Sequence, residues 1–193
     1  MGDATQDRAK AAELPEGDVI RILLEQHARI RELFSEIKTA DGEHKQHVFD
    51  ELRALLAVHE TAEEMVLRPV SKDAAGKSVV DARMHEEEEG NEVLKALEKM
   101  DVTSQEFDVK IGELEKAVDE HADKEESEEF PHILAKTDEQ KRASMGKQLK
   151  SAESIAPTHP HPSAAGSTGK QYTAGPFASL VDRTRDAIKG AMS

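Results

Sequence analysis

The sequence predicts an all-α protein: an up-down-up-down four-helix bundle with short extra helices at its C-terminal end. Aromatic residues make up only 3% of the 193 residues, while helix-favouring Ala, Leu, Glu and Lys are abundant. Four long segments carry apolar residues at helical spacing. The connections between these segments are short, which favours antiparallel packing of consecutive helices.

The chain begins with a polar stretch, residues 1–16, that we expect to form a flexible N-terminal arm. Asp18 then stands where it can cap a first helix over residues 19–38, because its short side chain can accept the free N–H groups of a first turn. The apolar residues of this segment repeat at helical spacing; they are Val19, Leu23, Ile30, Leu33, Phe34 and Ile37.

Two prolines set the expected ends of the second and fourth helices. The second helix is expected over residues 43–68 and should stop at Pro69, which lacks the N–H that a helix interior needs. The third helix is expected over residues 79–100. The fourth should run from about residue 105 to residue 130, where Pro131 ends or kinks it.

The bundle and a shorter fifth helix are expected to occupy residues 17–152, with Thr137 or Asp138 capping the fifth helix. Residues 153–175 are rich in Pro, Gly, Ser and Thr and should form a flexible linker. Residues 176–193 should form an amphipathic helix. We favour docking of this helix on the bundle over a partner or a membrane surface, because it has a weak basic excess and no Trp.

Composition excludes several classes of protein. The net charge of −14 opposes binding to nucleic acid, whose phosphates need a basic surface. The absence of cysteine excludes disulfides and thiolate metal sites. No apolar run approaches the roughly 18 residues of a membrane span, and the first residues lack the apolar core of a secretory signal. We therefore expect a cytoplasmic protein without a transmembrane segment.

Along the inner face of the expected fourth helix, apolar residues are followed by polar residues at the same helical spacing. Its apolar seam consists of Phe107, Ile111, Leu114 and Val118. Continuing the same steps of three and four residues leads to His121 and then Glu125. The second helix repeats the pattern, because its apolar seam leads to His59 and then Glu63.

The other two helices each offer one inward histidine. In the first, His27 lies between Leu23 and Ile30 at helical spacing. In the third, His85 lies eight residues before Val93, with Glu89 on the same line. A lone inward histidine is more often a hydrogen-bonded core residue than a ligand, but one from each of four helices is a different pattern.

These histidines and glutamates together indicate a metal site. A buried carboxylate is costly unless it is paired or binds a cation, and i, i+4 spacing places imidazole and carboxylate side by side. Six ligands from four helices are too many for one tetrahedral zinc, and the mixture of nitrogen and oxygen suits iron or manganese. Two carboxylates could each bridge two ions. The zinc-protease pattern HExxH is absent, and only one Glu-x-x-His pair of the ferritin type occurs.

The order of these motifs resembles the hemerythrin-like (HHE cation-binding) family over roughly residues 18–135. The matching elements are a histidine in the first helix, "HETAE" in the second, a histidine in the third and "HADKE" in the fourth. The resemblance implies a four-helix bundle that holds a non-haem di-iron centre, two iron ions joined by an oxo or hydroxo bridge. It further implies that His27, His59, His85 and His121 are terminal ligands and that Glu63 and Glu125 bridge the ions.

The sequence departs from the pattern of oxygen carriers in that family. Carriers have a second histidine in the third helix, and here Glu89 stands in its place. A carboxylate-rich site favours ferric iron, which argues against reversible O₂ transport. Glu60 and Glu89 are reserve ligands, and an equally good interpretation is a solvated acidic face.

Three functions are consistent with these features. The favoured one is a di-iron protein that detoxifies peroxide or related oxidants, with catalase-like or oxidase activity. The alternative is a non-enzymatic sensor or binder of O₂, nitric oxide or iron that signals through its C-terminal helix. A metal-free interaction module is the third. The expected partners are a small diatomic or peroxide ligand and a redox or signalling protein.

Overall fold

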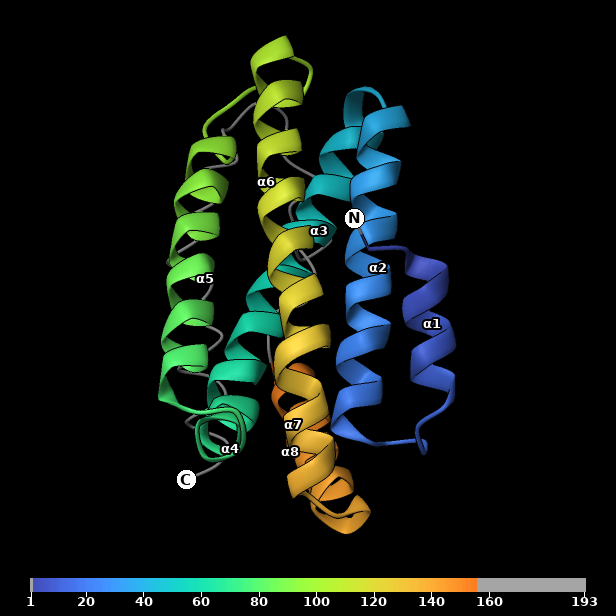
Figure 1. Ribbon diagram of the computed structural model, residues 1–193. Helices are drawn as coiled ribbons and strands as arrows, with labels where there is room; N and C mark the ends of the chain where they lie inside the picture. Colours follow the sequence, from blue (N-terminus) through green and yellow to red (C-terminus); the bar gives the residue numbers. More distant parts are fainter. Residues whose placement is uncertain (1, 156–193) are drawn as a thin grey trace.

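The structure, a computed structural model, describes residues 2–155. Four antiparallel helices form the bundle: α2 (Val19–Thr39), α3 (Gly42–Ala62), α5 (Lys77–Leu97) and α6 (Gln105–Lys124) (Figure 1). The all-α fold is therefore confirmed. Most of the expected linker and the whole expected C-terminal helix lie outside the described residues.

The expected helix starts are confirmed at two caps. The Asp18 carboxylate accepts a hydrogen bond from the Ile20 N–H at 3.0 Å, so α2 begins at Val19. The Asp138 carboxylate accepts from the Lys141 N–H at 2.7 Å, ahead of the fifth helix, α8 (Glu139–Ile155). Helix α8 packs against α2 and α3.

The N-terminal residues do not form a flexible arm. They form a helix, α1 (Ala4–Ala12), which lies along α2 (Figure 1). Asp3 caps this helix by accepting from the Thr5 N–H at 2.8 Å, and buried Asp7 forms an ion pair with Arg31 of α2. The expectation of an arm was wrong because the stretch has few apolar residues, and its anchor is a charge pair with a distant segment.

Neither Pro69 nor Pro131 ends a helix, which corrects the end expected at Pro69 and, at Pro131, the first of the two expected alternatives, an end or a kink. Helix α3 continues through a wide π turn, η1 (Glu63–Leu67), into α4 (Arg68–Ala74). Helix α6 continues in the same way through η2 (Glu125–Glu129) into α7 (Phe130–Lys136).

The reason lies in the hydrogen bonds next to each proline. The Arg68 N–H donates to the Glu63 carbonyl and the Phe130 N–H donates to the Glu125 carbonyl, five residues back in each case. This wider turn makes room for a ring that has no N–H and would clash in a regular α-helix. Each HxxxE motif therefore ends at the first residue of a π turn.

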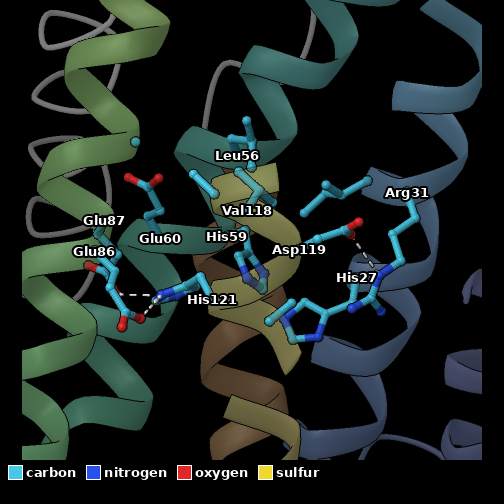
Figure 2. A pocket seen from close by; sticks show the side chains of 14 residues that line it. His27, Arg31, Leu56, His59, Glu60, Glu86, Glu87, Val118, Asp119 and His121 are labelled. Atoms are coloured by element: carbon cyan, nitrogen blue, oxygen red, sulfur yellow. Dashed lines mark hydrogen bonds and ion pairs between the residues drawn. The ribbon is translucent and has the colours of Figure 1, made fainter. Parts of the chain in front are cut away.

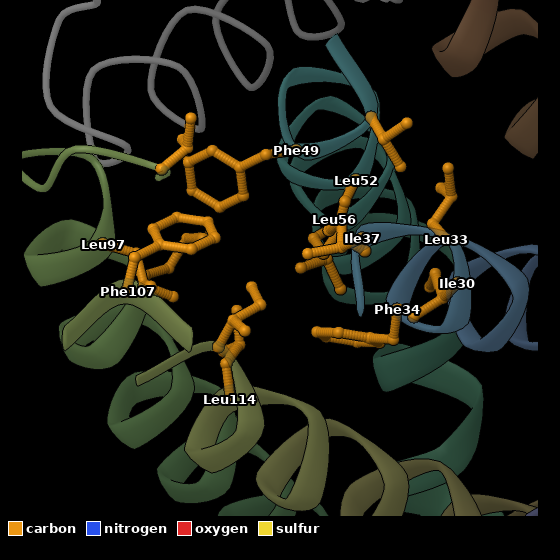
Figure 3. Packing of buried hydrophobic residues seen from close by; sticks show 14 of the residues in the cluster. Ile30, Leu33, Phe34, Ile37, Phe49, Leu52, Leu56, Leu97, Phe107 and Leu114 are labelled. Atoms are coloured by element: carbon orange, nitrogen blue, oxygen red, sulfur yellow. The ribbon is translucent and has the colours of Figure 1, made fainter. Parts of the chain in front are cut away.

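Two apolar cores fill the bundle. The upper core contains Phe34 from α2, Phe49 from α3, Leu97 from α5 and Phe107 from α6 (Figure 3). The lower core lies at the other end of these helices; it includes Leu23, Leu67, Phe130, Ile133 and Leu149. Along α2, α3 and α6 the segment between the two cores carries the polar residues of the HxxxE motifs and His27.

Within the described residues, no helix is long and apolar enough to cross a membrane.

Candidate metal centre

Five of the six expected ligands meet between the two cores. His27 comes from α2, His59 from α3 and His121 from α6, while Glu63 and Glu125 open the two π turns. The side chains of Glu63 and Glu125 are fully buried, with 0% exposure. Because a buried carboxylate is costly without a compensating charge, this region needs cations.

The ligand atoms fall into two overlapping clusters, within each of which they lie within 4.8 Å of one another. The first cluster combines His27 and His59 with Glu63 and Glu125. The second combines His121 and Glu87 with the same two glutamates. Glu63 and Glu125 therefore stand between two potential cation positions.

The three histidines present the same ring nitrogen to the centre. Nε2 of His27 lies 3.4 Å from Glu125 Oε2, and Nε2 of His59 lies 3.7 Å from Glu63 Oε1. Nε2 of His121 lies 3.2 Å from Glu125 Oε1. Glu63 and Glu125, the two expected bridging residues, thus lie next to all three imidazoles.

The opposite ring nitrogens contact oxygen atoms outside the clusters. Nδ1 of His27 lies 3.0 Å from Glu126, and Nδ1 of His59 lies 2.8 Å from the Gln26 side-chain oxygen. Nδ1 of His121 lies 3.2 Å from Glu86 Oε2. Since these oxygens only accept, each Nδ1 donates, and in the neutral ring this leaves the lone pair on Nε2. That tautomer is the one a metal needs, and such outer partners orient ligating histidines.

The pKa values of the histidines differ with their surroundings. Burial and the charge of His27 lower the pKa of His59 to about 3, which keeps this ring neutral. Burial also lowers the pKa of His121, but the Glu125 carboxylate outweighs it and raises the value to about 9. Burial and the charge of Glu125 raise the pKa of Glu63 well above its ordinary value. Without a metal, the charge of Glu125 thus disfavours ionisation of the neighbouring Glu63 carboxyl.

The structure does not bring His85 to the site. Its side chain is 71% exposed, and its Nε2 lies 3.6 Å from Glu89, which is also exposed. The inward line of α5 is marked instead by its buried residues, Val80, Arg83, Leu94 and Leu97. Steps of three and four residues along that line pass through Glu87.

The error came from the eight-residue spacing between His85 and Val93. Eight residues advance a helix by about 800°, which is about 80° beyond two full turns, so the two residues do not share a face. Glu87 takes the inward place, and its Oε1 lies 3.8 Å from Nε2 of His121. Val80 and Leu94 were the sequence signal that could have identified it.

A cation fits the residues that are present. Three buried atoms of the clusters have no hydrogen-bond partner among the described residues: His27 Nε2, Glu63 Oε1 and Glu125 Oε2. Buried polar atoms are rarely left in this state. All three face the first cluster, and imidazole with carboxylate is a donor set suited to iron or manganese.

Comparison with known proteins also indicates a cation-binding domain. The sequence model of the hemerythrin HHE cation-binding domain matches residues 18–133. The chain belongs to this hemerythrin family. A hemerythrin-like protein of Schizosaccharomyces pombe is 28% identical over 137 residues, which cover 69% of this chain and 68% of that protein.

A solved hemerythrin HHE domain protein from Mycobacterium kansasii has the same fold. Its TM-score is 0.65 at 20% identity, covering 84% of this chain and 96% of the other. The chain is thus a hemerythrin-like cation-binding protein in sequence and in fold.

The two reserve ligands of this hemerythrin domain have different surroundings. Glu89 lies on the solvated acidic face of α5. Glu60 is partly buried, and its carboxylate accepts a hydrogen bond from Asn91 at 3.1 Å. Burial and the charge of Glu87 raise the pKa of Glu60 to about 8. Neither belongs to the two clusters.

Sequence reasoning missed a buried arginine at the centre of the site. Nη2 of Arg68 donates to Glu125 Oε1 at 2.9 Å and to Glu63 Oε2 at 3.3 Å, and it also contacts Glu87. Nη1 of the same residue donates to both oxygens of Glu129, at 2.9 and 3.0 Å. The four carboxylates come from three segments of the chain, so neither Arg68 nor Glu129 has a local sequence signal.

A small cavity adjoins the clusters (Figure 2). Its volume is about 30 Å³, which is room for one or two water-sized molecules. His27, His59, His121 and Glu87 line one side, and Leu56 is among the apolar residues of the lining. The cavity can therefore admit a very small ligand to the ligating residues and little else.

Proposed function

We propose that this chain is a non-haem di-iron protein that handles O₂, peroxide or nitric oxide, with detoxification of peroxide as its favoured role. The observation that carries the proposal is the pair of clusters that share Glu63 and Glu125. The proposed ligands are His27 and His59 for one ion and His121 and Glu87 for the other, with the two shared glutamates between them. Bound iron would supply the redox chemistry, and the chain has no cysteine thiol to do so.

The residues around the site support a small and reactive ligand. The two apolar cores close both ends of the site, and the cavity beside it holds only one or two small molecules. Hydrogen bonds donated by each Nδ1 to outer carboxylates and to the Gln26 side-chain oxygen fix the histidines in the ligating tautomer. This arrangement favours peroxide or a diatomic gas over an organic substrate.

Anaerobic loading with Fe²⁺ followed by elemental analysis tests the metal content, and two irons per chain are expected. Oxygen evolution from added peroxide then tests the activity, in which two H₂O₂ give two H₂O and one O₂. The His59→Ala variant should lose both iron and turnover. His44→Ala is the matched control, because His44 is an exposed histidine of the same helix, 3.3 Å from Glu36.

The outcomes separate the candidate functions. A chain that binds no iron would contradict the proposal and favour a metal-free interaction module. A chain that binds two irons and nitric oxide but evolves no oxygen would favour the non-enzymatic sensor. The C-terminal helix through which such a sensor was expected to signal lies outside the described residues.

A further inference from the structure

Arg68 contacts more members of the second cluster than of the first. Its Nη2 touches three of the four members of the second cluster, namely Glu63, Glu87 and Glu125. The oxygens involved include Glu63 Oε2 and Glu125 Oε1. The other oxygen of each glutamate, Glu63 Oε1 and Glu125 Oε2, has no hydrogen-bond partner among the described residues.

The two free oxygens lie on the side of the first cluster. Glu63 Oε1 is 3.7 Å from His59 Nε2, and Glu125 Oε2 is 3.4 Å from His27 Nε2. The first cluster can therefore accept a cation without disturbing Arg68. In the second cluster the same carboxylates already hold a positive charge.

A cation and Nη2 cannot share the second cluster. A first-row divalent ion lies roughly 2.0–2.2 Å from its oxygen ligands, and Nη2 is 2.9 Å from Glu125 Oε1. An ion bound to the same oxygens would touch the guanidinium, and the two positive charges would repel each other. Binding of a second ion thus requires Nη2 to leave.

Glu129 gives Arg68 a second place to bind. Both oxygens of this fully buried carboxylate accept from Nη1, and Glu129 is a member of neither cluster. The guanidinium can release the second cluster while it remains paired. A buried arginine would otherwise be left as an uncompensated charge.

We propose that Arg68 is a placeholder cation for the second metal position. It balances Glu63, Glu87 and Glu125 until an ion arrives, and Glu129 then holds it. The two positions consequently fill in order, with the His27–His59 position first. This inference rests on the proposed two-metal site and adds a residue that sets the affinity of one half of it.

An anaerobic calorimetric titration with Fe²⁺ tests the inference on the full chain. The wild type should bind one ion tightly and a second more weakly. Arg68→Gln should strengthen the second step by about tenfold, because displacement of charge-assisted hydrogen bonds is no longer needed. Glu129→Gln should weaken the second step by about tenfold, because displaced Arg68 loses its partner. Arg142→Gln is the control, since it removes an arginine ion pair to Asp18 away from the site.

Equal first and second affinities in the wild type would overturn the inference. So would a second affinity in Glu129→Gln equal to that of the control, which remains a test even where Arg68→Gln fails to fold. A wild type that binds a single ion would contradict the proposed di-iron function. In that case Arg68 retains the role inferred here only if Arg68→Gln binds two ions.

Discussion

At the scale of single residues, the chemistry of the site depends on side chains that do not themselves belong to the clusters. Gln26, Glu86 and Glu126 each accept from one imidazole Nδ1 and so turn its Nε2 inward. Glu126 also accepts from Lys10 of α1 at 2.5 Å. The N-terminal helix is thereby connected to His27 through one carboxylate.

Loss of the Gln26 amide should weaken metal binding although Gln26 belongs to neither cluster, because its side-chain oxygen accepts from His59 Nδ1. In Gln26→Leu, the His59 ring is free to rotate and to change tautomer. We expect iron affinity to fall by about 10- to 100-fold, the usual effect of removing such an outer partner. Competition with a chelator measures this fall. Gln46→Leu, which alters a surface hydrogen bond to Asp50 on α3, should leave the affinity unchanged.

The corrected orientation of α5 makes a prediction about three residues of this helix. Glu87→Ala should lower the iron content, because Glu87 belongs to the second cluster. His85→Ala and Glu89→Ala should retain the wild-type content, because both side chains point to solvent. Elemental analysis after anaerobic loading distinguishes them. Equal iron loss in His85→Ala and Glu87→Ala would contradict the orientation of this helix.

At the scale of elements, the helices that the sequence predicted well are those with a continuous series of apolar residues at helical spacing. Along α6 the apolar positions lead directly to His121 and Glu125, and both lie where the steps placed them. Helix α5 has the run "EEEE", which offers a carboxylate to every face, so only distant Val80 and Leu94 reveal its phase. The continuation past Pro69 and Pro131 could not be predicted because it depends on wide turns that tertiary packing stabilises.

Helix α8 approaches the residues just before α2 so closely that one position accepts only glycine. A Cβ atom on Gly146 would lie 2.0 Å from the Gly17 carbonyl oxygen, and a backbone atom cannot easily move away. We expect Gly146→Ala to lower the free energy of unfolding by about 1–3 kcal/mol, the usual cost of overpacking. Urea unfolding measures the change.

Gly112 supplies the matched control for that substitution. It lies within α6, and a Cβ there would meet no atom within 4 Å. Gly112→Ala should raise the free energy of unfolding by about 0.5–1 kcal/mol, because alanine loses less backbone entropy in a helix. Destabilisation of the same size in both variants would contradict the close contact of α8.

At the scale of the whole molecule, a buried polar layer separates two apolar cores. The fold class and most proposed ligands were predictable because each depends on periodicity within one helix. The Arg68–Glu129 pair and the anchoring of α1 by Asp7 were not, because each depends on which charges meet across helices. Sequence spacing carries no information on such distant partners.

Metal should stabilise the whole fold, because it compensates charges that the bundle buries. At free iron 100 times above the dissociation constant, the gain is about 2.7 kcal/mol. Thermal unfolding of loaded and chelator-treated protein should show a higher midpoint for the loaded form, reversibly restored by added iron. The His59→Ala variant should show a much smaller difference. An equal shift in that variant would mean that iron stabilises the chain from elsewhere.

The paired π turns have a consequence for how this chain tolerates change in length. Each turn accommodates one residue more than a regular helix, so the segment after it is rotated by about 100° relative to the seam before it. Phe130 and Ile133 reach the lower core only with that offset. Deletion of a single residue from the turn, such as Ser127, would remove the wider turn, direct both side chains away from the core and leave Pro131 to clash with the preceding turn. A one-residue deletion should therefore be more harmful here than many substitutions. A related sequence with an alignment gap at this point would have its following helix rotated relative to the one in this chain.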